Sequence, residues 1–151
     1  MLKKFVGVLI LLFVALQFYR PARNLSASIG PNDISVKHPL PPAVKTVLAN
    51  ACYDCHSNNT RYPWYAEMQP AAWWLGRHVR DGKEHLNFSE FGSYTAKRQG
   101  KKLEAVFDEV DQHTMPLKSY TWMHPAARLT PAEVKLLTDW AQSLADEIAP
   151  E

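Results

Sequence analysis

Cysteine is scarce in this chain of 151 residues, which has only Cys52 and Cys55. Without a third cysteine there is no disulfide framework, and a structural zinc site would lack its usual second pair of cysteine ligands. A disulfide between two residues this close would close a very small loop and add little stability. No cysteine follows the apolar N-terminal segment, so a lipid anchor on cysteine is excluded as well.

An excess of charge of one sign is also missing, because the net charge is only +2. Four of the basic residues, Lys3, Lys4, Arg20 and Arg23, belong to the N-terminal segment, and without them 13 basic residues face 15 acidic ones. A slightly acidic folded part is a poor match for DNA or RNA, so no nucleic-acid partner is expected. With 46% hydrophobic and 21% charged residues, the chain has the composition of one globular domain.

The two cysteines belong to the motif Cys52-Tyr53-Asp54-Cys55-His56. This spacing is that of covalent c-type haem attachment, in which both thiols bond to one porphyrin and the adjacent imidazole binds its iron. A thioredoxin-like redox pair is a weaker alternative, because it needs a βαβ pattern and no strand rich in valine and isoleucine is evident. The motif therefore predicts one haem c per chain, with His56 as the proximal ligand.

The N-terminus has the features of an export signal, since Lys3 and Lys4 precede an apolar run over residues 5–16. This run is shorter than the ~20 residues that cross a bilayer, but Phe18 and Tyr19 extend it as interfacial anchors. No clear cleavage site follows. We therefore expect residues 1–20 to be an uncleaved transmembrane signal anchor, although cleavage stays open. A single-pass protein of the cytoplasmic membrane with its haem domain in the periplasm is predicted.

Five prolines follow between residues 20 and 42, and they predict an extended, non-helical tether over residues 21–42. The domain proper, residues 43–149, is expected to be all-α. Helices are predicted from Pro42 to Cys52, over residues 71–80 with Gly82 beyond the end, over 97–112, and after a capping box at Thr130 and Glu133. The five tryptophans suit the wall of a large apolar cofactor cavity.

A second iron ligand is expected from the segment between the last two helices, where Met115 precedes Pro116. A neutral thioether favours ferrous iron and raises the reduction potential relative to a second histidine. Met115 is therefore the preferred distal ligand. Three histidines remain alternatives: His78, which lies four residues after Trp74, His113 and His124.

Four segments carry a family pattern: CYDCHSNNTRYPWY at 52–65, Pro70 with Trp74 and His78, LNFSEF at 86–91, and Met115-Pro116 with Tyr120, His124 and Trp140. Together they resemble the haem-binding domain family of small bacterial proteins, and the helix-delivered motif resembles class I cytochromes c. The resemblance covers residues 40–145. It implies haem on Cys52 and Cys55 with His56 proximal, in a membrane-anchored or exported cytochrome-like domain.

These observations predict an electron-transfer protein, not an enzyme, that exchanges one electron with redox partner proteins at the membrane. A five-coordinate haem serving as gas sensor or peroxidase-like catalyst is the alternative, with His78 or His113 in the distal pocket. A haem-free thiol-disulfide oxidoreductase is the third hypothesis.

Overall fold

The computed structural model describes residues 1–148 and contains only helices and loops in that range. The prediction of an all-α chain is confirmed; position 149, the expected end of the domain, lies outside the described residues. The elements run in the order α1 Leu2–Leu16, α2 Ile34–Lys37, α3 Pro42–Ala51, α4 Tyr53–His56, η1 Trp64–Glu67, α5 Ala71–His85, η2 Phe88–Ser93, α6 Ala96–Asp111, α7 Lys118–Met123, η3 Pro125–Ala127 and α8 Pro131–Ile148.

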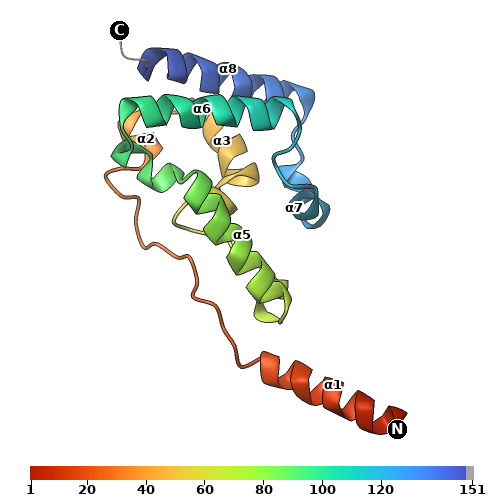
Figure 1. The fold of residues 1–151 in the computed structure, drawn as a ribbon. Helices are drawn as coiled ribbons and strands as arrows, with labels where there is room; N and C mark the ends of the chain where they lie inside the picture. Colours follow the sequence, from red (N-terminus) through yellow and green to blue (C-terminus); the bar gives the residue numbers. More distant parts are fainter. Residues whose placement is uncertain (149–151) are drawn as a thin grey trace.

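The two long helices α6 and α8 lie side by side and cover one end of the domain (Figure 1). Their apolar stripes face the core, with Leu103 and Val110 from α6 and Leu137 from α8 buried. Short helix α3 adds Val44 and Leu48, both fully inaccessible. The helical periodicity of the sequence thus predicted the core correctly, since burying these stripes is what stabilises amphipathic helices.

The start of α8 also follows its sequence signal. The Thr130 amide donates to Glu133 Oε2 over 2.8 Å, and the Glu133 amide donates back to Thr130 Oγ1 over 3.3 Å. Both reciprocal hydrogen bonds of the predicted capping box are therefore formed. Pro131 occupies the first helical position, where the missing amide hydrogen removes no helical hydrogen bond.

Helix α5 is longer than predicted, because it continues through Gly82 to His85. The prediction that Gly82 lies beyond the helix end was wrong. The reason is a tertiary contact: a Cβ built on Gly82 would lie 2.8 Å from the Cys55 carbonyl oxygen and 3.1 Å from the Cys55 Cβ. Glycine stands here because α5 passes directly against α4, and not because the helix stops.

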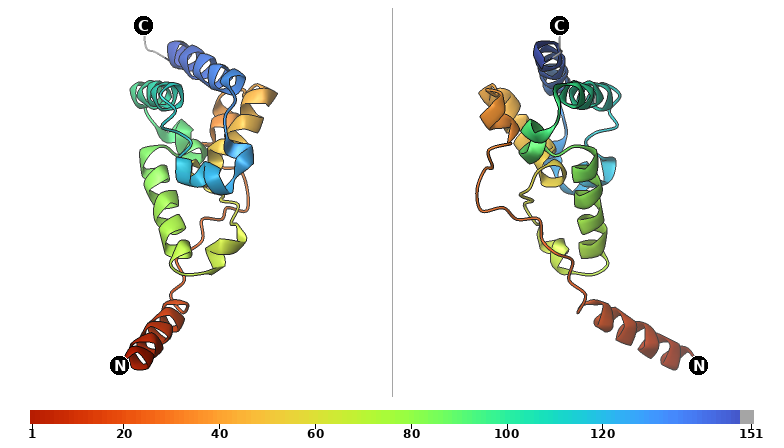
Figure 2. Two further views of the ribbon diagram at one scale, coloured as in Figure 1. Left: turned by 90° about the vertical axis from the view of Figure 1, so that its right-hand side faces the viewer. Right: turned by 60° about the vertical axis from the view of Figure 1, so that its left-hand side comes forward.

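At the N-terminus, α1 projects away from the other helices in every view (Figures 1 and 2). Among residues 1–148, no helix combines the length and the apolarity that crossing a bilayer requires. The following segment is mostly extended, but the expectation that it contains no helix was wrong. Asp33 accepts a hydrogen bond from the Ser35 amide and caps the single turn of α2, whose Ile34 is fully buried in the core.

The segment is also hydrogen-bonded to the domain rather than free. The Gln69 amide donates to Gln17 Oε1 over 2.9 Å, and Gln69 Nε2 donates to the Tyr19 carbonyl over 2.6 Å. Further along, Asn24 Nδ2 donates to the Ser57 carbonyl over 2.8 Å. The chain between α1 and α2 therefore lies along the domain and completes the loop after the cysteine motif.

Candidate functional site

The cysteine motif is delivered by two short helices in succession. Cys52 ends α3, with its amide donating to the Leu48 carbonyl, and α4 then forms a single turn from Tyr53 to His56. Residues three and four positions apart share a face of such a turn, so Cys52, Cys55 and His56 are directed to one side. Both thiols are free and partly buried.

That side is a cavity of about 390 Å³, within the usual range for ligand pockets. Its walls come from α3, α4, α5, α6 and the segment 115–120. They include all four residues predicted to hold the cofactor, Cys52, Cys55, His56 and Met115. Two segments about sixty residues apart in sequence therefore meet at one cavity.

The imidazole of His56 is held by a backbone carbonyl. Its Nδ1 lies 3.0 Å from the Leu86 oxygen, and because a carbonyl only accepts, Nδ1 carries the hydrogen. Burial lowers the pKa of His56, although its hydrogen bonds to the backbone oppose this shift. The ring is therefore neutral at pH 7 with Nε2 unprotonated, the state in which imidazole binds a metal.

A polar cluster fixes the Leu86 segment against the loop after the motif. Asn87 Nδ2 donates to Asn58 Oδ1 over 2.9 Å, and the Asn58 amide donates to Ser89 Oγ over 3.1 Å. Asn58 Nδ2 donates in turn to Glu90 Oε1 over 2.8 Å. These contacts join the two segments SNN and LNFSEF and so position the carbonyl that orients His56.

Met115 reaches the cavity through a tight turn after α6. The amides of Thr114 and Met115 both donate to the Glu109 carbonyl, each over 3.0 Å, and Pro116 and Leu117 line the cavity beyond them. His78 of α5 also lines it. The other two histidine candidates do not: His113 Nδ1 bonds to the Val110 carbonyl and His124 stacks on the Tyr120 ring.

Sequence analysis missed a buried carboxylate inside the motif. Asp54 accepts hydrogen bonds from the Arg61 amide and Nε, both 3.0 Å, and from the Tyr120 hydroxyl at 2.7 Å. Burial raises the pKa of Tyr120, and the hydrogen bond to Asp54 raises it further. Asp54 thus connects the motif to α7, the helix that follows Met115. No sequence signal marks this pairing across 66 residues.

The tryptophans do not line the cavity, contrary to expectation, and its wall is formed instead by smaller side chains such as Leu86, Phe88 and Val106. Trp74 and Trp122 line a neighbouring groove that adjoins the cavity and shares Cys55, His78, Leu117 and Tyr120 with it. Trp140 packs instead beside the α6–α8 core, and the other four tryptophans are exposed on η1, α5 and α7.

A comparison with protein families identifies the cofactor of this protein. Residues 11–143 match the model of the family described as "Haem-binding domain". The chain belongs to the haem-binding domain family. The resemblance inferred from the sequence is confirmed, and haem is the cofactor of this protein. No curated protein and no solved structure matches the chain significantly.

The residues of the haem-binding domain fit that cofactor. Two free thiols and a neutral imidazole with an available Nε2 border the same cavity, together with a thioether sulfur. Its basic side chains include Lys102, which suits a haem propionate. The preceding residue, Lys101, is exposed to solvent, and the sequence alone does not show which of the two lysines borders the cavity.

Proposed function

We propose that this haem-binding domain is a mono-haem c-type cytochrome that carries one electron at a time. Cys52 and Cys55 would bond the haem covalently, with His56 as the proximal and Met115 as the distal iron ligand. The observation that carries the proposal is that both thiols, His56 and Met115 line one cavity. The haem would supply the ferric–ferrous couple.

The chain's own residues suit this task. The Leu86 carbonyl orients His56, and the turn on the Glu109 carbonyl holds Met115. Both ligands are neutral, and thioether ligation favours the ferrous state. A site that keeps the same two ligands in both oxidation states reorganises little, which favours fast electron transfer to and from redox partner proteins.

We further propose that the N-terminal segment 1–20 anchors the protein in the cytoplasmic membrane with the haem domain in the periplasm; α1 alone is too short to cross the bilayer, and Phe18 and Tyr19 would extend the apolar segment to the interface. The apolar run at residues 5–16 supports this, as does covalent haem attachment, which takes place outside the cytoplasm in bacteria. The hydrogen bonds of Gln17 and Asn24 support an uncleaved anchor, because cleavage between them and the domain would remove part of the fold.

The distal ligand provides the test. The full chain, produced in a host with cytochrome c maturation machinery, should gain the mass of one haem and show a weak ferric absorption band at long wavelength. Met115→Ala should abolish this band, whereas the control Met123→Ala, in the neighbouring groove, should keep it. An unchanged low-spin spectrum in Met115→Ala would disprove Met115 ligation.

A second function is favoured by one observation, that His78 lines both the haem cavity and the groove beside it. A histidine near an open iron position would suit a gas sensor or a peroxidase-like catalyst. A high-spin ferric spectrum of the unmodified protein would support this function. The thiol-disulfide hypothesis is disfavoured, because burial raises the pKa of Cys52 to about 12 and of Cys55 to about 11.

A further inference from the structure

The exposed large apolar side chains of the domain are gathered in three neighbouring elements. Among residues 37–148, the exposed large apolar side chains belong to η1 and the residue after it, to the first turn of α5, and to α7. We call this set the tryptophan face: Trp64, Met68, Trp73, Trp74, Trp122 and Met123. Trp122 is 76% and Trp64 71% exposed, which is unusual for the largest apolar side chain.

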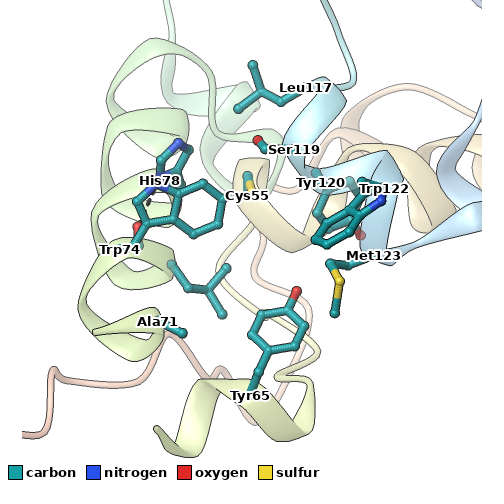
Figure 3. Close-up of a pocket in the computed structure, with 11 residues that line it drawn as sticks. Cys55, Tyr65, Ala71, Trp74, His78, Leu117, Ser119, Tyr120, Trp122 and Met123 are labelled. Atoms are coloured by element: carbon teal, nitrogen blue, oxygen red, sulfur yellow. Dashed lines mark hydrogen bonds between the residues drawn. The ribbon is translucent and has the colours of Figure 1, made fainter. Parts of the chain in front are cut away.

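Part of this face encloses a groove of about 300 Å³ (Figure 3). Trp74 from α5 and Trp122 and Met123 from α7 stand on its two sides, and Tyr65 from η1 lies at one end. The ring of Trp64 contacts that of Tyr65, with centroids 5.9 Å apart. An exposed apolar groove with further apolar side chains beside it marks a binding surface.

The attachment of α1 indicates what covers the face. Gln69, which is buried and lies between Met68 and Trp73 in sequence, binds Gln17 at the end of α1 and the carbonyl of Tyr19. The apolar helix α1, every residue of which is exposed, therefore leaves the domain beside η1, the residue after it and the first turn of α5, which contain four of the six residues of the tryptophan face. A surface at the base of a membrane anchor is held against the bilayer.

The charges and the residue types around this face also suit a membrane surface. The acidic side chain among residues 60–78 is Glu67, and Arg23 pairs with it, while α7 carries Lys118 and no acid. Arg20 donates to the Glu67 carbonyl at the same place. Tryptophan is enriched where hydrocarbon meets headgroups, and basic residues are attracted to anionic lipid.

We propose that the tryptophan face rests in the interface of a phospholipid bilayer, as a second membrane contact beside α1. This inference rests on the proposed anchoring of α1 but not on the proposed electron transfer. The groove that reaches Cys55 would then open toward the lipid.

The test uses the full haem-loaded chain in vesicles that contain anionic phospholipid and a phospholipid with a diazirine on its acyl chain. After irradiation, adducts are mapped by mass spectrometry. Adducts are expected on α1, on the peptide 62–76 and on the peptide 118–124, and α8 should stay unlabelled. Trp122→Glu should lower labelling of 118–124 on the order of tenfold, because carboxylates are disfavoured in the interface. The control Gln142→Glu adds the same charge on the exposed side of α8 and should change nothing.

Labelling confined to α1 would overturn the inference and leave the anchor intact, favouring a protein partner for the face. Labelling of neither α1 nor the face would overturn both the inference and the proposed anchoring. The absorption spectrum of the same sample reports separately on the haem ligands.

Discussion

Gly82→Ala is the substitution for which helix propensity and packing predict opposite effects. Gly82 lies inside α5, where alanine normally stabilises a helix by about 0.5–1 kcal/mol. The new Cβ, however, would lie 2.8 Å from the Cys55 carbonyl oxygen and 3.1 Å from the Cys55 Cβ. Neither atom belongs to a flexible side-chain end, so the overlap can be relieved only by moving α5 away from α4.

The required movement sets the size of the effect. Restoring ordinary contact distances would separate the two helices by about 0.5 Å, and overpacking of a closely packed region costs about 1–3 kcal/mol. After subtracting the middle of the propensity range from the middle of the overpacking range, Gly82→Ala should lower the free energy of unfolding by about 1 kcal/mol. The same movement would stretch the 3.0 Å contact between His56 Nδ1 and the Leu86 carbonyl, because Leu86 directly follows α5.

Gly100→Ala is the matched control, since Gly100 is also inside a helix, α6, and nothing lies within 4 Å of its added Cβ. It should stabilise the protein by about 0.5–1 kcal/mol. Urea unfolding of the full chain in detergent, followed by circular dichroism, measures both. If Gly82→Ala stabilises as much as Gly100→Ala, the close approach of α5 to Cys55 does not exist.

The remaining predictions concern contacts that hold the site and the helix ends. Tyr120→Phe removes the hydroxyl bond to Asp54 and should cost about 1.5 kcal/mol at pH 7 by urea unfolding. Because the pKa of Tyr120 is raised in the folded state, wild-type loses stability above about pH 10, where the unfolded chain ionises, and the difference between the two proteins should shrink there. Glu133→Ala should cost about 0.5 kcal/mol at this exposed cap. The hydrogen bonds to Thr130 lower the pKa of Glu133, so the loss should disappear in thermal melts as the pH falls below about 4. Asn24→Ala should leave the helices intact but increase hydrogen exchange in the loop after the cysteine motif, and unchanged exchange there would contradict the docking of the N-terminal segment.

Features encoded within one helical turn could be predicted from the sequence. The spacing of Cys52, Cys55 and His56 fixes their common direction once α4 forms, and the pair Thr130 and Glu133 defines the start of α8. The family was identified for the same reason, because its motifs are short and contiguous. That Met115 borders the cavity was a reasonable expectation from its position, although its role as ligand stays a prediction.

Features that depend on contacts between distant segments could not be predicted. Gly82 signals a helix end in sequence, and only the proximity of Cys55 explains why the helix continues. The prolines of residues 21–42 indicate extended chain but do not reveal that Asn24 bonds to the loop at Ser57. Nor does a high tryptophan content distinguish the wall of a cavity from an exposed face.

Asp54 explains how the two halves of the candidate haem site keep their relative position. It lies within the motif that carries the proposed proximal ligand, and it accepts a hydrogen bond from the hydroxyl of Tyr120, five residues after Met115. At the other end of the segment from Met115 to Tyr120, the Met115 amide donates to the Glu109 carbonyl near the end of α6. The segment that carries the distal candidate is therefore restrained at both ends, and one of the restraints is the motif itself. Such a segment has little freedom to move when the charge on the iron changes, and this is the property that the proposed electron transfer requires.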